Sequence, residues 1–129
     1  MIYLASPYSH EDPRVRDQRF DEVSAAAAAL MARGVQLFCP ISHTHPIAVM
    51  GDLPKGFEFW ETYDRWFLER CDAIVIAKIN GWRQSKGVTA EREIAAELGL
   101  PDVAYDRGGH PTWDLAADKV VSILDGLDD

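Results

Sequence analysis

The stretch DAIVIAKINGWRQSKGVTAEREIAAELGLPDVAY, residues 72–105, decides the fold. It begins with a mostly apolar run, Asp72 to Ala77, which predicts a buried strand. Apolar residues then recur at helical spacing from Val88 to Leu98, and Gly99 is typical of the position after a helix end. Val103 to Tyr105 predicts a second strand. A strand, a helix and a strand in this order form a parallel unit with a right-handed crossover, which indicates an α/β fold.

The rest of the chain repeats this alternation. Two more strands and three more helices are predicted from the same kinds of apolar spacing: Ile2–Ala5, Val35–Cys39, Asp12 to Gly34, Phe57–Arg70 and Trp113–Leu124. The segment Ile41–Gly56 is rich in His, Pro and Gly without a clear period and is predicted to be a long functional loop. Ile79–Gly87 is predicted to be a second polar loop. We therefore expect one domain over residues 1–129, a three-layer α/β sandwich with a mainly parallel sheet.

The composition is that of one globular domain. Of the 129 residues, 47% are hydrophobic and 26% are charged, so a core can form without a disulfide or a metal. Acidic residues outnumber basic ones by 21 to 13, and the net charge of -8 disfavours binding to duplex nucleic acid or to anionic membranes. The sequence begins without a recognisable leader and has no apolar run of about 20 residues. Its two cysteines, Cys39 and Cys71, lie among apolar neighbours as buried thiols do, so we expect a cytoplasmic protein.

One acidic residue of the predicted helix Val88–Leu98 lies on the face that should be apolar. At about 100° per residue, Val88, Ile94 and Leu98 line the side expected to face the sheet. Glu91 lies near the centre of that side. A carboxylate there costs several kcal/mol unless it is paired, hydrogen-bonded or facing a cavity. Because α/β folds bind ligands beyond the carboxyl ends of their strands, where this helix begins, Glu91 is the predicted catalytic residue.

Asp64 repeats this anomaly in the preceding predicted helix. The apolar face of Phe57–Arg70 includes Trp60 and Phe67, and Asp64 falls within it. One interpretation is that Asp64 and Glu91 form structural salt bridges with arginines. The other is that they form a site, because paired carboxylates suit cleavage of a glycosidic bond. One carboxylate attacks or stabilises the anomeric carbon, and the second manages a proton or hydrogen bond on the leaving group.

Three motifs occur together in the chain. Residues 3–8 read YLASPY, Asp64 precedes the next predicted strand, and Gly87, Glu91 and Ala95 follow one another at intervals of four. In this combination, over roughly the first 105 residues, the chain resembles the nucleoside 2-deoxyribosyltransferase superfamily, which includes the 2'-deoxynucleoside 5'-monophosphate N-glycosidases. The resemblance implies a Rossmann-like sandwich whose parallel sheet has about five strands. It also implies a homodimer or higher homo-oligomer in which neighbouring subunits complete each pocket.

The resemblance implies roles for individual residues. Glu91 matches the family nucleophile, which attacks C1', and Asp64 matches the aspartate that contacts the reacting base or sugar. The transferases that act on free nucleosides carry an aspartate six residues before the nucleophile, whereas this chain has Ser85, as the monophosphate hydrolases do. Four residues match the segment that lines the pocket after the first strand: Tyr3, Ala5, Ser6 and Tyr8.

Ser85 has two interpretations. Its hydroxyl and the amides of Lys86 and Gly87, at the start of a predicted helix, suit a 5'-phosphate, which an aspartate would repel. Alternatively, Ser85 only caps the helix. The chain lacks the small-Ser-x-Arg arrangement that the monophosphate hydrolases carry after their first strand. Three residues are candidate replacements for it: Ser9, Arg14 and Arg16.

Two histidines and a tryptophan complete the predicted site. His43 and His45 are interpreted as pocket residues that bond the base edge or the sugar, or as anchors of the predicted loop. A zinc site would need a third ligand that the pattern lacks. Trp82 is a core residue by default, but its loop also places it to cover a base by stacking or to line a subunit interface. The chemistry requires no metal and no organic cofactor.

The expected function is cleavage of the N-glycosidic bond of a (deoxy)nucleoside 5'-monophosphate or nucleoside, with Glu91 acting at C1'. Two alternatives stay open. One is a nucleoside 2-deoxyribosyltransferase, which passes the sugar to a second base. The other is a nucleotide-binding or sensing module that performs no chemistry. In each case the expected partner is a small nucleotide or nucleoside, not duplex nucleic acid or a membrane.

Overall fold

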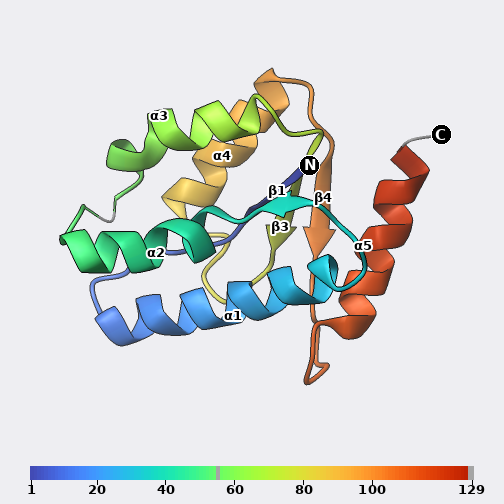
Figure 1. Ribbon diagram of the computed structural model, residues 1–129, viewed down its shortest axis with the longest axis horizontal. Coiled ribbons are helices and arrows are strands. Elements are labelled where there is room, and N and C mark those ends of the chain that lie inside the picture. The colour runs from blue at the N-terminus through green and yellow to red at the C-terminus, as the bar shows by residue number, and fades with distance from the viewer. Residues whose placement is uncertain (55, 128–129) are drawn as a thin grey trace.

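The computed structural model describes residues 1–54 and 56–127 of the chain. Residues 55, 128 and 129, which the predicted domain also spans, lie outside the described part. Strands and helices alternate along the chain as far as the second strand, after which two helices follow in succession (Figure 1). The elements in chain order are β1 (Ile2–Ala5), α1 (Pro13–Met31), β2 (Leu37–Phe38), α2 (Pro40–Gly51), α3 (Phe57–Leu68), β3 (Ala73–Ala77), α4 (Lys86–Glu97), β4 (Asp102–Tyr105) and α5 (Asp114–Leu127).

The sheet has four parallel strands in the order β2-β1-β3-β4. This confirms the predicted α/β sandwich with a parallel sheet. The expectation of about five strands is wrong for the residues that the structure describes. Each of the four apolar runs in the sequence forms one strand, and after β4 the chain continues through a turn into α5. No further apolar run in that last segment is available to form a strand, since its apolar residues are spaced for a helix.

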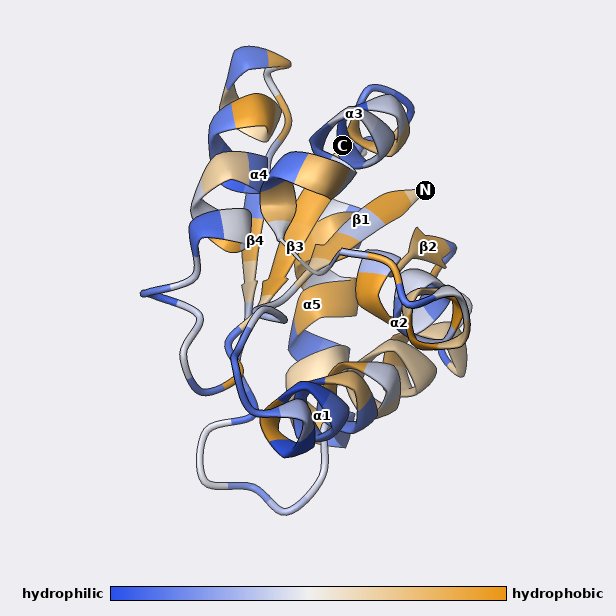
Figure 2. Ribbon diagram, turned by 90° about the vertical axis from the view of Figure 1, so that its left-hand side faces the viewer, coloured by the Kyte–Doolittle hydropathy of each residue, from blue (hydrophilic) through white to orange (hydrophobic). Residues whose placement is uncertain are grey.

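Helices cover both faces of the sheet (Figures 1 and 2). Helix α1 packs against α5 on one face, and α3 packs against α4 on the other. In Figure 2 the strands are coloured mostly as hydrophobic, whereas the helices carry both hydrophobic and hydrophilic residues. The strand period of two assigns side chains to the two faces. In β1, Ile2 and Leu4 join the core under α1 and α5, whereas Tyr3 and Ala5 join the core under α3 and α4.

The segment Ile41–Gly56 is a helix over most of its length, so the prediction of a long loop is wrong for its described residues. Helix α2 spans Pro40–Gly51, and residue 55 lies outside the description. The buried residues of α2 include Ile41, His45 and Ala48, at helical intervals of four and three. The period is hidden in the sequence because its central member is a histidine and because Pro46 lies inside the helix.

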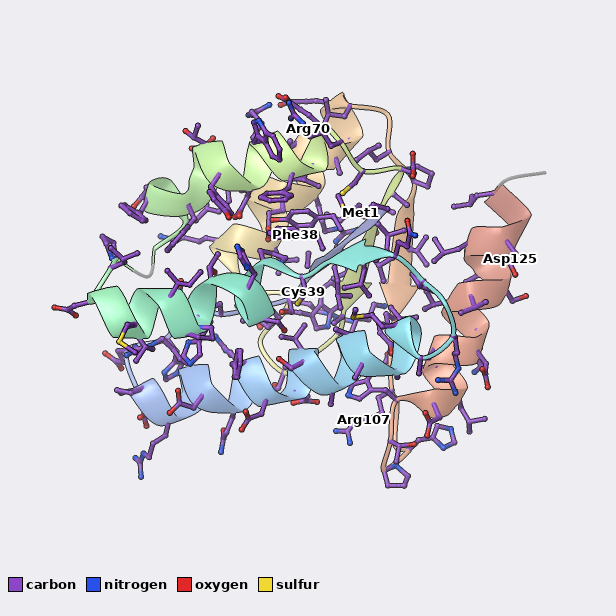
Figure 3. All side chains as sticks on the ribbon, in the orientation of Figure 1. Met1, Phe38, Cys39, Arg70, Arg107 and Asp125 are labelled. Carbon is purple, nitrogen blue, oxygen red and sulfur yellow. The ribbon has the colours of Figure 1, made fainter. Side chains whose placement is uncertain are left out.

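Several element boundaries differ from the predicted ones. The second strand is shorter than the predicted Val35–Cys39, because only Leu37 and Phe38 pair with β1. Phe38, labelled in Figure 3, stacks on Phe67 of α3 with ring centroids 3.7 Å apart, which ties this edge of the sheet to the helix. Helix α4 begins at Lys86, two residues before the predicted start. The predicted buried thiols are confirmed, since Cys39 and Cys71 are both buried and free.

Truncation of a β1 side chain in the core under α1 and α5 is predicted to lower the stability of the fold strongly. Leu4 is fully buried among residues of α1 and β3. Leu4→Ala is expected to lower the free energy of unfolding by about 3 kcal/mol, because it leaves a cavity in a packed core. The matched substitution Leu115→Ala, at a side chain that is 53% exposed, should change it by less than about 0.5 kcal/mol. Urea denaturation of both variants measures the difference, and equal effects would contradict the assignment of this core.

Candidate functional site

A cavity of about 390 Å³ opens beyond the carboxyl ends of the strands. The direction of strand order reverses between β1 and β3, and parallel α/β sheets bind ligands at such a switch point. The volume lies within the range of small-molecule sites. Residues from the loop after β1, from α2 and α3, and from the start of α4 line it: Ser6, Tyr8, Ser9, Pro40, Ile41, Thr44, Ala48, Gly56, Phe57, Glu58, Trp60, Asp64, Gln84, Ser85, Lys86, Gly87 and Glu91.

Glu91 lines this cavity from the second turn of α4. Its side chain is on the sheet-facing side of the helix, beside Val88, Ile94 and Ala95, and the residue is 5% exposed. The predicted burial of Glu91 is therefore confirmed. The hydroxyl of Tyr3, in the central strand β1, donates a hydrogen bond to Glu91 Oε2. The acid thus has a neutral donor on one side and the open cavity on the other.

Asp64 lines the same cavity from α3 and is also buried, at 7% exposed. Across residues 1–54 and 56–127, neither Asp64 nor Glu91 forms an ion pair. The adjacent Arg65 points elsewhere and pairs with Glu97 of α4 at 3.6 Å. The interpretation of structural salt bridges with arginines is therefore wrong. Two acids without a cation partner, buried beside one cavity, favour the interpretation as a site.

Burial raises the pKa of both acids. For Asp64, removal from water raises the pKa from 3.8 to about 7, and the nearby Tyr3 hydroxyl opposes that rise. For Glu91, burial is again the largest cause, the negative charge of Asp64 adds to it, and the hydrogen bond from Tyr3 opposes it. The pKa of Tyr3 itself is raised well above 10, chiefly by burial, so its hydroxyl keeps its proton as a donor. The charge of one acid therefore disfavours ionisation of the other, and the state with both acids ionised is costly.

The N-terminus of α4 forms another part of the wall. Ser85 is the N-cap, and its Oγ accepts a hydrogen bond from the Val88 amide at 3.2 Å, so the capping interpretation is confirmed. The amides of Lys86 and Gly87 belong to the first turn, where N–H groups have no acceptor within the helix. Both residues line the cavity. The helix therefore presents the positive end of its dipole there, whether or not the Ser85 hydroxyl contributes.

Ser6 is the polar residue of the site with the most unusual surroundings. It is 4% exposed, and within the described part of the chain its Oγ has no hydrogen-bond partner. It follows β1 directly and lines the cavity. Native structures leave few buried hydroxyls unsatisfied, so Ser6 is a candidate contact for a bound molecule.

Tyr8 and the two predicted histidines lie at different depths. Tyr8 lines the cavity, and its Oη lies 2.6 Å from Nδ1 of His45. His45 is buried behind Tyr8 and is not among the described residues of the wall. His43 is exposed and bonds Tyr63 Oη of α3 at 3.0 Å, outside that wall. His43 is therefore placed as an anchor between α2 and α3.

The remaining predicted residues of the pocket are divided between the wall and its support. Gly87 lies in the wall, whereas Ala5 is fully buried in the core beneath it. Tyr3 is fully buried as well and reaches the site through Glu91. Trp82 packs against the core under α3 and α4, with the amino group of Lys78 5.0 Å from its ring centroid, and is not part of the described wall.

The three candidate replacements for the missing arginine motif differ in whether they line the cavity. Ser9 lines the cavity. Arg14 instead pairs with Asp12 at the start of α1, and Arg16 donates to the carbonyl of His10. Sequence reasoning missed another arginine, Arg19, which donates to the carbonyl oxygens of Tyr8 and Ser9 at 3.4 and 2.8 Å and so holds the loop after β1.

Sequence reasoning also missed most of the wall that α2 and α3 contribute. The apolar part of that wall consists of Pro40, Ile41, Ala48, Phe57 and Trp60. Interpreting the segment after β2 as a loop hid the first three. The available signal was Pro40, since proline is favoured in the first turn of a helix.

The fold and the site define a parallel α/β domain with a buried pair of acids at the carboxyl edge of its sheet. A family model described as a domain of unknown function (DUF1937) matches residues 1–107, and the chain belongs to that family. Comparison with curated proteins yields no significant match. No helix in the described chain has the length and apolar character needed to cross a membrane. Within the same residues, no group of three or more His, Cys, Asp or Glu side chains is placed to hold a metal ion.

The raised pKa of Asp64 predicts a pH-dependent stability penalty. Between the unfolded pKa of 3.8 and the folded pKa of about 7, the folded state binds more protons than the unfolded state, so the free energy of unfolding falls as pH rises. Asp64→Asn cannot ionise and escapes this penalty. The stability of Asp64→Asn relative to the parent is therefore expected to increase from pH 4 to pH 8, by a few kcal/mol.

Urea denaturation at several pH values measures this difference. Glu61→Gln is the matched control, because Glu61 is an exposed acid of the same helix and its substitution should add little pH dependence. A relative stability of Asp64→Asn that stays constant over this pH range would contradict the burial of an ionisable group at this position.

Proposed function

We propose that the protein cleaves the N-glycosidic bond of a nucleoside 5'-monophosphate or nucleoside by hydrolysis. The observation that carries the proposal is the acid pair: Glu91 and Asp64 are buried without a cation partner beside one cavity, and Tyr3 donates to Glu91. Such an arrangement destabilises the fold, so it is expected to serve chemistry. The proposal includes membership of the nucleoside 2-deoxyribosyltransferase-like superfamily, which the motifs around Tyr3, Asp64 and Glu91 resemble.

The first step divides the work between the two acids. In this scheme Glu91 acts as the ionised acid, a form that the hydrogen bond from Tyr3 supports, and Asp64 carries a proton. The Glu91 carboxylate forms a bond to C1' as the bond between C1' and the base nitrogen breaks. The bonding electron pair leaves with the base, which takes the proton of Asp64. The products of this step are the free base and a sugar joined to Glu91.

The second step returns the site to its starting state. A water molecule attacks C1', the bond between C1' and the Glu91 oxygen breaks, and Asp64 accepts the proton of the water. The sugar is released with a hydroxyl at C1', and Asp64 is again the protonated member of the pair. In this scheme no metal and no organic cofactor takes part.

The two ends of the cavity suit the two ends of a nucleotide. The first turn of α4 offers the amides of Lys86 and Gly87 to an anion, and the unsatisfied hydroxyl of Ser6 lines the same space. These groups support binding of a 5'-phosphate. The apolar wall from α2 and α3, which includes Ile41 and Trp60, supports binding of the flat base.

The alternatives differ from the proposal in the fate of the bound ligand. A deoxyribosyltransferase would use a second base in place of water and would exchange labelled base into the substrate. A nucleotide-binding module would bind without releasing base, but such a module gains nothing from the cost of burying Glu91 and Asp64. Chromatography of nucleosides and 5'-monophosphates incubated with the protein, with and without an added base, distinguishes the three.

Glu91→Gln is expected to lower the rate of base release at least about a thousandfold, because the amide cannot act as the nucleophile. Glu93→Gln is the matched control, since Glu93 is an exposed acid of the same helix, and it should leave the rate near that of the parent. The measurement is free base by chromatography, with circular dichroism to establish that both variants fold. Base release by Glu91→Gln at the parent rate would refute the role of Glu91.

The proposal also includes a homo-oligomer. Helices α2 and α3, which flank the cavity, expose large apolar side chains to solvent. Such side chains on neighbouring helices favour an interface, and a second copy there would lie beside the mouth of the cavity. The exposed residues are Ile47, Val49 and Met50 of α2 and Phe59, Tyr63 and Trp66 of α3.

Met50→Glu is expected to dissociate this oligomer, because it places a charge in an apolar interface while the residue, 88% exposed in one chain, contributes little to the fold. Light scattering should give the mass of one chain, 14.4 kDa, for the variant and a multiple of it for the parent. Leu115→Glu, at an exposed leucine of α5, is the matched control and should keep the parent mass. A parent protein with the mass of one chain would contradict the proposed oligomer.

A further inference from the structure

A chain of three hydrogen-bonded side chains approaches the cavity from the side of α1 and α2. Asp17 of α1 lies with Oδ1 3.1 Å from Nε2 of His45, and Nδ1 of His45 lies 2.6 Å from Oη of Tyr8. His45 is held between two aromatic rings, with Phe20 4.7 Å and Tyr8 5.3 Å from its ring centroid. His45 is 7% exposed, whereas the Asp17 side chain is 67% exposed. The proposed hydrolysis of the glycosidic bond uses none of these three residues.

The chemistry of Asp17 and Tyr8 determines which atom donates in each of the two hydrogen bonds of His45. An ionised Asp17 only accepts, so Nε2 of His45 carries a proton. In a neutral imidazole the other ring nitrogen is then bare, and Nδ1 accepts the hydroxyl proton of Tyr8. Burial raises the pKa of Tyr8, so the phenol keeps that proton. With its proton committed to His45, Tyr8 Oη can only accept a hydrogen bond from a molecule in the cavity.

Tyr8 lies at the end of the cavity that suits the base. It packs against the core under α1 and α5 and bonds α2, whereas the amides suited to a phosphate belong to α4 on the opposite face of the sheet. The same wall includes Ile41 and Ala48 of α2. A nucleotide whose phosphate lies at the start of α4 therefore directs its base toward the side on which Tyr8 lies.

We infer that Tyr8 selects bases that carry an exocyclic amino group, with Asp17 and His45 as positioning residues that fix its hydroxyl as an acceptor. The inference rests on the proposed function, because it assumes a nucleotide in the cavity. An amino group at C4 of a pyrimidine or C6 of a purine donates to Tyr8 Oη. The oxo group of the corresponding keto base presents a lone pair to an oxygen that has no proton left to offer, so such bases are disfavoured.

Calorimetric titration of the full chain tests this inference with two matched pairs of ligands, dCMP with dUMP and dAMP with dIMP. Glu91→Gln serves as the parent so that the ligands are not consumed. One pair, pyrimidine or purine, is expected to bind more tightly than the other. Within that pair, the nucleotide with the amino group is expected to have an affinity about tenfold higher than the nucleotide with the oxo group. Equal binding, or tighter binding of the oxo member, would overturn the inference.

Variants of Tyr8 and Asp17 separate selection from general support of the fold. Tyr8→Phe, added to the parent, should bring the ratio of affinities close to one while binding persists. Asp17→Asn should also lower the ratio, because an amide no longer forces the proton onto Nε2 of His45. Asp21→Asn is the matched control, since Asp21 is an exposed acid one turn further along α1, and it should leave the ratio unchanged. A ratio that Tyr8→Phe or Asp17→Asn does not change would contradict the inference.

The test also separates this inference from the proposed function. If the wild-type chain releases base without distinction between amino and oxo members, the inference fails and the proposed hydrolysis stands. If none of the four nucleotides binds and no base is released, both fail, and the acid pair needs another substrate.

Discussion

The hydrogen bond from Tyr3 to Glu91 joins the centre of the sheet to the helix that carries the acid. Both residues are buried, and the described structure offers Glu91 no cation, so this neutral donor and the open cavity are its compensation for lost water. Asp64 is buried beside the same cavity, so a negative charge on Asp64 raises the free-energy cost of a negative charge on Glu91. Burial of the two acids beside one cavity therefore disfavours the state in which both are ionised.

The parts of this arrangement that follow from local periodicity can be predicted from the sequence. The strand period of two places Tyr3 on the same face of the sheet as α4, and the helical period places Glu91 on the side of α4 that faces the sheet. An acidic residue on an otherwise apolar face is the clearest indicator of a functional site in such a pattern, because few structural roles account for a buried acid. The burial of Glu91 and Asp64, and the four strands, were accordingly predictable.

The parts that depend on partners distant in the sequence were not predictable. His45 is buried because Tyr8, Asp17 and Phe20 surround it, and no local pattern distinguishes such a histidine from one in a polar loop. The same histidine hides the apolar face of α2, and with it part of the wall of the cavity. The unsatisfied hydroxyl of Ser6 is visible only in the structure, because satisfaction is a property of the surroundings and not of the residue.

The charge and polarity of the cavity wall differ from one part to another, and these differences limit which ligands can bind. The start of α4 favours a negative group, Glu91 and Asp64 contribute two buried acids, and Tyr8 with α2 combines apolar contact with a hydrogen-bond acceptor. A ligand with an anion at both ends would meet Tyr8 Oη and the nearby Asp17 unfavourably, whereas a wholly apolar ligand would leave the first-turn amides and Ser6 without partners. A molecule with one anionic end, a cleavable polar centre and a flat end that donates hydrogen bonds would match all three groups of residues, and the proposed substrates, nucleotides with amino-bearing bases, have this order of groups.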